Sequence, residues 1–282
     1  MSVNLTENQR SSVFRLLADD DSSTVSMVKR QLIEAGDDSV SCLEDWLKQA
    51  HGLPAERHLA EVLGHLKQGH CHRQFLHACA QAGSSSEVDL EEASFLLAAT
   101  EYAATDMGTY RRQLDEIADQ IRNEIKKGGP SSQIRALSHQ LHEKLGFRGN
   151  RNRYFEADNT YINRVIERRV GVPLTLSLIY ILLGRRLELG IEGVALPGHF
   201  IVTWQGKFFD PFNQGRLLNA DACREMVEAR GHVFREEHLK PASPRQVLLR
   251  MLGNLQRVYE YDEDRARTAR IQQYLQALEG RS

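Results

Sequence analysis

The 282-residue chain has few of the features that mark secreted or nucleic-acid-binding proteins. It has only four cysteines, and scattered thiols in a chain of this length do not form the dense disulfide framework of a small secreted domain. Its 36 basic and 38 acidic residues leave a formal net charge of -2, which provides no general field for attracting a nucleic acid or an anionic membrane. We therefore expect reduced cysteines, no nucleic-acid partner and no membrane partner.

No stretch of the sequence is apolar for long enough to cross a bilayer. The longest uncharged apolar segment, Gly171 to Gly184, has 14 residues, whereas a spanning helix needs about 20. Residues 1–8 contain neither the basic region nor the apolar region of a secretory signal. Together these absences predict a cytoplasmic protein.

Signatures for metals and nucleotides are also missing. Four histidines and two cysteines gather in one segment, but they have none of the Cys-x-x-Cys or His-Glu-x-x-His spacings of zinc sites; they are His65, His70, Cys71, His72, His77 and Cys79. Neighbouring residues such as His70, Cys71 and His72 point to different sides of a helix. No glycine-rich phosphate loop follows a predicted strand. We expect no metal site and no cofactor.

Hydrophobic periodicity predicts a mostly helical protein of the α+β class in three parts. In residues 1–82, apolar positions recur at helical spacing between short polar breaks, which indicates several short amphipathic helices in a HEAT-like module. A boundary is predicted at Gly83–Ser86, followed by a domain at 89–240 and a C-terminal helical hairpin at 241–282. The content of 41% hydrophobic and 26% charged residues is typical of globular domains.

The central domain is expected to combine helices with a small antiparallel sheet. Helices are predicted at 90–104, 107–127, 131–145, 160–169 and 173–189, and again at 219–229, 243–260 and 263–279. Pro173 suits the first turn of its helix. Short β-branched and aromatic stretches predict strands at 194–196, 199–204 and 207–210.

A two-residue hairpin loop at Gln205-Gly206 would bring a histidine and an aspartate to one face of this sheet. In that register the numbers of two paired residues add up to 411. His199 and Asp210 then become diagonal neighbours whose backbones are about 7 Å apart. A buried carboxylate that orients one ring nitrogen leaves the other as a base. A three-residue loop would put the two side chains on opposite faces, so the pairing depends on the loop length.

The nucleophile that would complete this pair is missing from its expected position. The start of the helix at Pro173 would favour an anion, because free N–H groups and the helix dipole lie there. That segment reads Pro-Leu-Thr-Leu-Ser and offers Thr175, whose hydroxyl is far less acidic than a thiol. Cys223, 13 residues after Asp210, is a more distant candidate.

Six stretches between Leu90 and about residue 260 form a recognisable set. They are LEEA at 90–93, GFRGN at 146–150, NTYIN at 159–163, ERRVGVPLTL at 167–176, LPGHF at 196–200 and DPF at 210–212. This set resembles the SirB family of transglutaminase-like proteins, a branch of the transglutaminase and papain-like superfamily. The resemblance implies that His199 and Asp210 match the superfamily's histidine and aspartate. It also implies that the superfamily cysteine would fall near Thr175 and that this family generally lacks it.

Polar residues ahead of the Pro173 helix are candidates for ligand binding. The resemblance makes Asn159, Tyr161, Asn163 and Glu167 signature positions, although asparagines also cap helices and hold turns. Between Lys144 and Glu188 there are nine basic residues against four acidic ones. That run could bind a phosphate or an acidic partner, or form a solvated face.

Two functions agree with these observations. The leading hypothesis is a pseudoenzyme, a transglutaminase-like domain without thiol chemistry that binds a peptide or protein partner between the Pro173 helix and the His199 strand. The alternative is an amide hydrolase or acyltransferase in which Thr175 or Cys223 attacks, His199 is the base and Asp210 orients it. The distance from each candidate nucleophile to the His199 ring separates the two hypotheses.

Overall fold

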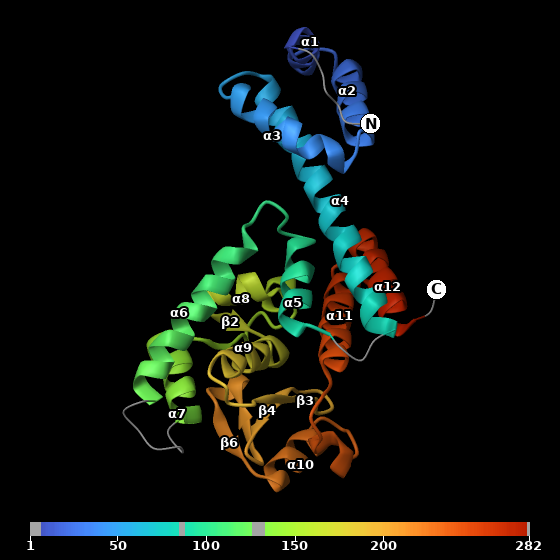
Figure 1. Ribbon diagram of the computed structural model, residues 1–282. Helices are drawn as coiled ribbons and strands as arrows, with labels where there is room; N and C mark the ends of the chain where they lie inside the picture. The colour runs from blue at the N-terminus through green and yellow to red at the C-terminus, as the bar shows by residue number, and fades with distance from the viewer. Residues whose placement is uncertain (1–6, 85–87, 126–132, 281–282) are drawn as a thin grey trace. The chain divides into compact units, whose positions relative to one another are not determined.

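The computed structural model describes residues 7–84, 88–125 and 133–280, which form two compact units (Figure 1). Unit 1 comprises the residues up to Phe75 together with Ala99–Thr105, and unit 2 comprises Leu76–Ala98 and the residues from Asp106 onward. The predicted division into 1–82, 89–240 and 241–282 stays a prediction, and part of its Gly83–Ser86 boundary falls outside the described residues. No helix among the described residues is both long and apolar enough to span a membrane.

Unit 1 is built from helices around one apolar cluster. They are α1 (Glu7–Leu17), α2 (Ser22–Glu34), α3 (Val40–Gln49) and the first part of α4 (Ala55–Ser84). Asp21 begins α2 by accepting hydrogen bonds from the backbone N–H groups of Ser23 and Thr24. Leu43, Trp46 and Leu59 are among the buried residues of the cluster.

The last helix of this region is far longer than predicted. Only short helices were expected before a break at Gly83, yet α4 has 30 residues and continues through Gly83 to Ser84. Phe75, Cys79 and Ala82 are buried along its second half, and burial of such residues stabilises a continuous helix. Gly83 allows the backbones of α4 and α12 (Arg265–Glu279) to approach closely, because a Cβ at this position would lie 2.7 Å from the Ala277 carbonyl oxygen.

Unit 2 contains the remaining helices and all the strands, which confirms the mostly helical α+β class. Its helices are α5 (Leu90–Ala99), α6 (Met107–Ile125), α7 (Gln133–Ser138), α8 (Ile162–Arg168), α9 (Pro173–Arg186), α10 (Ala220–Glu228), α11 (Pro244–Tyr261) and α12 (Arg265–Glu279). The helix predicted at 131–145 instead consists of α7 and a π-helical turn at His139–Lys144, and residues 131–132 lie outside the described ranges. Pro173 is the first residue of α9, as predicted.

The sheet of unit 2 has the predicted hairpin at its centre. Its strand order is β3 (Glu192–Val194), β4 (Ile201–Trp204), β5 (Lys207–Asp210) and β6 (Arg216–Leu218), all antiparallel. Trp204 pairs with Lys207 and Val202 with Phe209, so the register that sums to 411 is confirmed. The sequence patterns missed β6 and the short parallel pair of β1 (Arg148–Gly149) with β2 (Val170–Gly171).

Helix α9 is the centre of the core of unit 2. Every residue from Pro173 to Gly184 is buried, and the helix packs against α6, β3, β4 and α11 (Figure 1). A helix that is apolar on all sides is stable only when it is covered all round. At its end Arg186 pairs with Glu91 of α5 and Asp115 of α6, both at 2.7 Å, which fixes α9 between those two helices.

Gly215, before β6, has a backbone conformation and a crowded position that only glycine tolerates. Its φ is +69°, and a Cβ would lie 2.5 Å from Ser138 Oγ and 2.7 Å from the Tyr180 hydroxyl. Gly206 in the hairpin has a similar φ of +72° with no atom within 4 Å of its hypothetical Cβ. Comparing alanine substitutions at the two glycines therefore separates the free energy cost of a positive φ from that of steric crowding.

We predict that Gly215→Ala destabilises the protein more than Gly206→Ala. A positive φ costs each alanine roughly 1–2 kcal/mol, and overpacking adds about 1–3 kcal/mol at residue 215 alone. Urea unfolding of both variants measures the difference in free energy of unfolding. Equal losses in the two variants would contradict this account of residue 215.

Candidate functional site

A buried histidine and aspartate lie side by side where the β4–β5 hairpin opens. His199 Nε2 and Asp210 Oδ2 are 3.0 Å apart, and the two residues are 4% and 0% exposed. His199 precedes β4 and Asp210 ends β5, so the two-residue loop between these strands determines their pairing. The juxtaposition predicted from the hairpin register is therefore present.

Asp210 is held by more than the imidazole. Its carboxylate also accepts hydrogen bonds from Asn213 Nδ2 at 2.6 Å and from the backbone N–H groups of Phe212 and Asn213. Burial raises the pKa of Asp210. The hydrogen bonds from His199 and Asn213 together lower this pKa by more than burial raises it, so the net pKa shift is downward. The carboxylate is therefore ionised and oriented, and it caps the short 3₁₀ helix at Pro211–Asn213.

The carboxylate also determines which nitrogen of His199 is free. An ionised carboxylate can only accept a hydrogen bond, so the proton of a neutral imidazole lies on Nε2. Nδ1 then has a lone pair, and no hydrogen bond to it occurs within the described part of the chain. The ring is arranged as an oriented base or hydrogen-bond acceptor.

A pocket of about 340 Å³ opens beside this ring. Its lining residues come from five separate segments of the chain and are Arg151, Tyr154, Pro173, Gly198, His199, Phe212, Asn213 and Arg230. The start of α9 and the His199 loop therefore face the same space, as the sequence predicted for the cleft. The Phe212 ring stands edge-on to the imidazole with centroids 6.0 Å apart.

The Thr175 hydroxyl has a backbone hydrogen-bond partner, and Thr175 does not line the pocket. The residue is completely buried, and its Oγ1 donates a 3.5 Å hydrogen bond to the carbonyl oxygen of Thr160. Ser177, two residues further along α9, likewise donates to the carbonyl oxygen of Phe200 at 3.3 Å. Hydroxyl groups that bond to backbone carbonyls in this way satisfy buried polar groups from distant parts of the chain.

Cys223 is close to the site but belongs to a hydrophobic cluster. It is fully buried on α10 among residues that include Val194, Ile201 and Val227. Burial and the charge of Asp210 raise the pKa of its thiol to about 11, so the reactive thiolate is disfavoured. Within the described residues, no hydrogen bond joins Cys223 or Thr175 to His199.

One of the four predicted ligand-binding residues supports a loop of the pocket. Asn159 is buried, donates hydrogen bonds to the carbonyl oxygens of Arg153 and Tyr154, and accepts one from Asn150, so it holds the loop that carries Arg151 and Tyr154. None of the four predicted residues lines the pocket.

The other three predicted residues have separate environments. Tyr161 and Tyr259 share a hydrogen bond of 2.6 Å between their hydroxyls. Asn163 is buried, and its Oδ1 has no hydrogen-bond partner among the described residues. Glu167 is half exposed and pairs with Arg164 on the surface of α8. A ligand-binding role for these residues stays a prediction.

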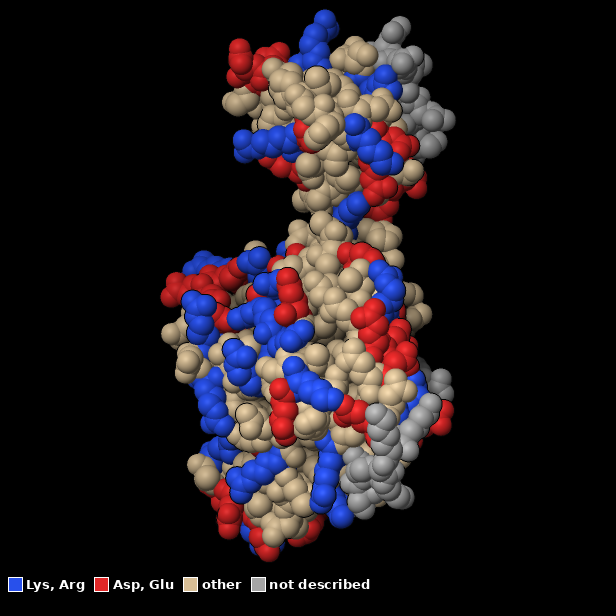
Figure 2. Space-filling model, turned by 90° about the vertical axis from the view of Figure 1, so that its left-hand side faces the viewer, with Lys and Arg blue, Asp and Glu red and all other residues tan. Residues whose placement is uncertain are grey.

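Several of the basic residues between Lys144 and Glu188 form ion pairs with acidic residues of the same protein. Arg153 and Arg168 pair with Glu156, at 3.0 and 2.7 Å. Arg164 pairs with Asp158 at 3.0 Å. On the face of the molecule in Figure 2, basic and acidic side chains are interspersed in the same way. Local charge excess in the sequence therefore does not by itself locate a binding surface.

Sequence reasoning missed most of the side chains that give the pocket its character. Arg230, at the end of α10, and Tyr154 come from segments with no motif, and only folding places them beside His199. It also missed a polar network of His142, Tyr180 and Ser138. The Tyr180 hydroxyl is 2.8 Å from His142 Nε2 and 3.0 Å from Ser138 Oγ, and burial lowers the pKa of His142.

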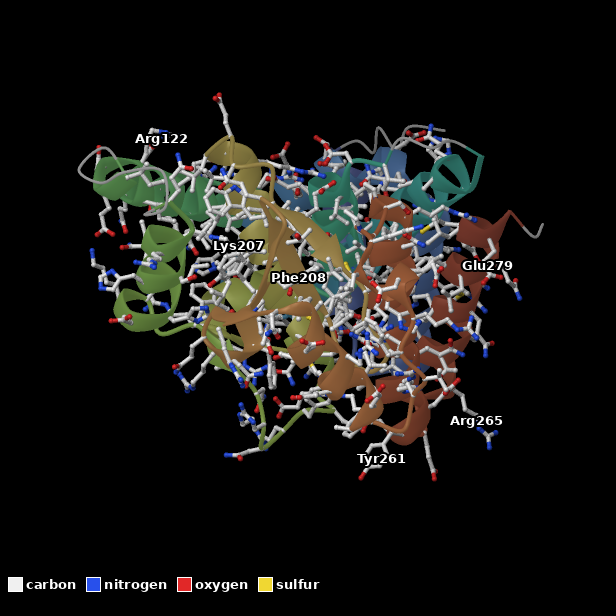
Figure 3. All side chains as sticks on the ribbon, turned by 90° about the horizontal axis from the view of Figure 1, so that it is seen from below. Arg122, Lys207, Phe208, Tyr261, Arg265 and Glu279 are labelled. Atoms are coloured by element: carbon white, nitrogen blue, oxygen red, sulfur yellow. The ribbon has the colours of Figure 1, made fainter. Side chains whose placement is uncertain are left out.

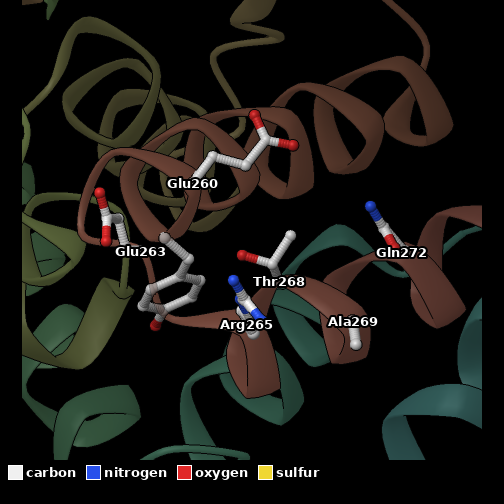
Figure 4. A pocket seen from close by; sticks show the side chains of 7 residues that line it. Glu260, Glu263, Arg265, Thr268, Ala269 and Gln272 are labelled. Carbon is white, nitrogen blue, oxygen red and sulfur yellow. The ribbon is translucent and has the colours of Figure 1, made fainter.

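A pocket of about 490 Å³ between α11 and α12 is a weaker candidate (Figure 4). Glu260, Glu263 and Arg265 contribute charged groups, but its lining contains no histidine and no cysteine. Its two hydroxyls are engaged: that of Thr268 donates to the carbonyl oxygen of Asp264 at 2.8 Å, and that of Tyr259 shares a hydrogen bond with Tyr161.

The cluster of histidines and cysteines on α4 has other contacts. His70 Nδ1 lies 2.8 Å from Asp37 Oδ2. Cys79 is completely buried, and burial raises the pKa of its thiol to about 12. Over the described ranges, no three histidine, cysteine or acidic side chains are arranged to hold a metal ion.

Comparisons with known proteins identify the family of this domain. Residues 108–253 match a family model described as the transglutaminase-like superfamily. A UPF0162 protein of Xylella fastidiosa (strain Temecula1) is 34% identical over 64% of this chain and 68% of its own length. A UPF0162 protein of Pseudomonas aeruginosa is 29% identical over 64% of this chain and 69% of its own length. Human F-box only protein 21 is 31% identical over 44% of this chain and 21% of its own length. No solved structure matches significantly.

We predict that Asp210→Asn lowers the free energy of unfolding at neutral pH by about 1.5–3 kcal/mol, because it removes a charged hydrogen-bond acceptor from a buried site. The folded state depresses the pKa of Asp210 below its ordinary 3.8. Its stabilisation is therefore present above that pH and is lost as the pH falls through the folded-state pKa.

Urea unfolding over a range of pH tests this prediction. The difference between the native protein and Asp210→Asn should narrow as the pH falls below 3.8. Asp119→Asn, at an exposed acid of α6, is the control and should change stability by no more than about 0.5 kcal/mol. A difference that stays constant or widens in acid would overturn the assigned role of Asp210.

Proposed function

The chain belongs to the transglutaminase-like superfamily, and from this premise we propose that it is a non-catalytic member that binds a peptide segment of a partner protein in the His199 pocket. The observation that supports the proposal most directly is an oriented His–Asp pair with no nucleophile against it. His199 Nδ1 is free among the described residues, while the Thr175 hydroxyl bonds to a backbone carbonyl and Cys223 lies in an apolar cluster. The finer assignment to the SirB family, in which the core cysteine is absent, is part of the same proposal.

The chemistry of the start of α9 supports a binding role over acyl transfer. An attacking atom must lie about 2.6–3.2 Å from its base, or slightly farther before substrate binds. The α9 segment that begins at Pro173 offers no thiol, and its hydroxyls at Thr175 and Ser177 are buried and engaged. What remains is a pocket with a polar floor and aromatic and basic walls, which suits recognition.

The similarity to F-box only protein 21 supports the view that this domain is a module. The matched region covers 21% of that human protein, so a related sequence is used there within a much longer chain. Recognition of another protein is a role that such a module can keep in different chains. A cytoplasmic location stays a prediction.

One observation favours the alternative of an amide hydrolase or acyltransferase. The 3.0 Å contact between His199 and Asp210 is the geometry that orients a catalytic base, and a ligand that moved Thr175 or Cys223 toward Nδ1 would complete a nucleophilic site. The two functions differ in one measurable respect, since only the enzyme forms an acyl adduct or cleaves a bound peptide.

We predict that the full chain binds peptides without reacting with them. A synthetic random peptide pool with free C-termini is incubated with the protein, and bound peptides are recovered and identified by mass spectrometry. Hydrogen exchange should show peptide-dependent protection in the segments that contain Tyr154, His199 and Asn213. Failure to recover peptides, or protection only elsewhere in the chain, would contradict the proposal.

We predict that Thr175→Ala leaves peptide affinity unchanged within about twofold, because the hydroxyl does not face the pocket. Intact-mass analysis after treatment with hydroxyl- and thiol-directed acylating probes gives the second measurement. The native protein and the His199→Ala variant should give the same adducts. A His199-dependent adduct, or loss of binding in a folded Thr175→Ala variant, would support the enzyme instead.

A further inference from the structure

Two arginines line the His199 pocket, and neither pairs with a carboxylate within the described residues. Arg151 donates a hydrogen bond to Asn213 Oδ1, and its guanidinium lies 5.5 Å from the centre of the Phe212 ring. Arg230 donates to the carbonyl oxygen of Met226 at 2.7 Å. These partners are neutral, and each guanidinium has five N–H donors, so both arginines keep donors and a full charge for another group.

A glycine brings Arg230 close to the histidine. Gly198 has a φ of +73°, and a Cβ at this position would lie 2.6 Å from Arg230 Cδ. The arginine therefore packs on the backbone immediately before His199, where any other residue would displace it. Its guanidinium and the imidazole border the same pocket.

Two more arginines add positive charge next to this pocket. The charges of Arg230, Arg250 and Arg257 all act on the Tyr154 hydroxyl, which lines the pocket, although burial outweighs them and raises the pKa of that tyrosine. Arg250 is half-buried and donates to the carbonyl oxygen of Leu196 at 3.3 Å. Burial and the neighbouring charge of Arg257 lower the pKa of its guanidinium.

The contrast with Arg186 shows what this cluster lacks. Arg186 is also half-buried in unit 2, but Glu91 and Asp115 neutralise it and raise the pKa of its guanidinium. Beside the His199 pocket, the charge of Arg257 repels that of Arg250. Within the described residues, no ion pair joins Arg151, Arg230, Arg250 or Arg257 to a carboxylate, and the printed partners of the first three are neutral. A bound anion would relieve this repulsion, and guanidinium groups favour planar oxyanions such as carboxylates.

Exposed aromatic side chains extend the pocket toward a larger ligand. Tyr154 is 38% exposed, Phe155 59% and Tyr261 77%. Phe155 and Tyr261 stack with centroids 6.0 Å apart, and Tyr154 stands edge-on to Phe212 of the pocket wall. In Figure 3 Tyr261 projects outward from the ribbon at the edge of the molecule. Arginine and aromatic side chains are enriched in protein interfaces, which favours a peptide over a free inorganic ion as the ligand.

We propose that the pocket binds an acidic peptide segment, with a carboxylate held between Arg151 and Arg230 and an adjacent part of the peptide lying against Tyr154, Phe155 and Tyr261. The carboxylate belongs either to an aspartate or glutamate side chain or to the C-terminus of the partner chain. This inference rests on the proposed binding function and adds the chemistry of the ligand to it.

The test uses the peptides recovered by the full chain from the random pool with free C-termini. The strongest binders are resynthesised with a fluorescent label in three forms: unchanged, with glutamate or aspartate replaced by the matching amide, and with an amidated C-terminus. Fluorescence polarisation then gives the Kd of each form. One of the two neutralised forms should bind at least about tenfold more weakly, because it leaves the arginines unpaired. That form identifies the source of the carboxylate.

Protein variants locate the interaction without relying on one substitution. Arg230→Ala and Arg151→Ala should each raise the Kd of the unchanged peptide by about tenfold or more. Arg230→Lys should raise the Kd less than Arg230→Ala, because lysine keeps the positive charge but lacks the planar guanidinium. Arg265→Ala is the matched control, since Arg265 is exposed and lines the separate pocket of α11 and α12. Its Kd should stay within about twofold of the native value.

The outcomes separate this inference from the proposed function. Peptides that bind and protect the pocket, yet lose no affinity on neutralisation of their carboxylates or on Arg230→Ala, would overturn the inference and leave the binding function standing. Equal weakening by Arg265→Ala would also overturn it, because attraction would then come from net charge alone. Recovery of no peptide at all would overturn both proposals.

Discussion

The hydrogen bond between His199 and Asp210 is the interaction on which the rest of this site depends. An ionised carboxylate with almost no exposure to water is costly unless its oxygens are satisfied. Here the imidazole, the Asn213 amide and two backbone N–H groups supply the donors. The same bonds fix the 3₁₀ helix that carries Phe212 into the pocket wall. The site cannot lose the carboxylate without also losing part of its shape.

The surroundings of this pair determine which chemistry is open to it. Helix α9 is covered on all sides, so the hydroxyls of Thr175 and Ser177 are used to satisfy backbone carbonyls inside the core. A group engaged in this way is a poor nucleophile, because attack would first require breaking its hydrogen bond inside the core. The imidazole is bound to Asp210 through Nε2, and the lone pair on Nδ1 has no hydrogen-bond partner among the described residues. Such an arrangement suits holding a ligand better than acylating one.

The arginines of unit 2 differ in whether an acidic side chain neutralises them. Arginines that face acidic side chains, such as Arg168 and Arg186, connect elements of the fold. Arg151 and Arg230 have only neutral partners and border the pocket, so their charge is available to a ligand. Asn159 contributes indirectly because it holds the loop that carries Arg151. In the proposed function, the residues that would contact a ligand and the residues that support them are thus distinct sets.

The helical content, the hairpin register and the approach of His199 to Asp210 could be predicted from the sequence, because these depend on local periodicity and on a two-residue turn. The length of α4, the burial of Thr175 and the meeting of the arginines depend on contacts between distant segments and could not. Arg151, Arg230 and Arg250 come from three distant segments and follow no common spacing, so no local pattern can indicate that they meet. Likewise, a basic residue and its acidic partner are recognisable as a pair only after folding has brought them within a few ångströms, where the Coulomb energy becomes appreciable.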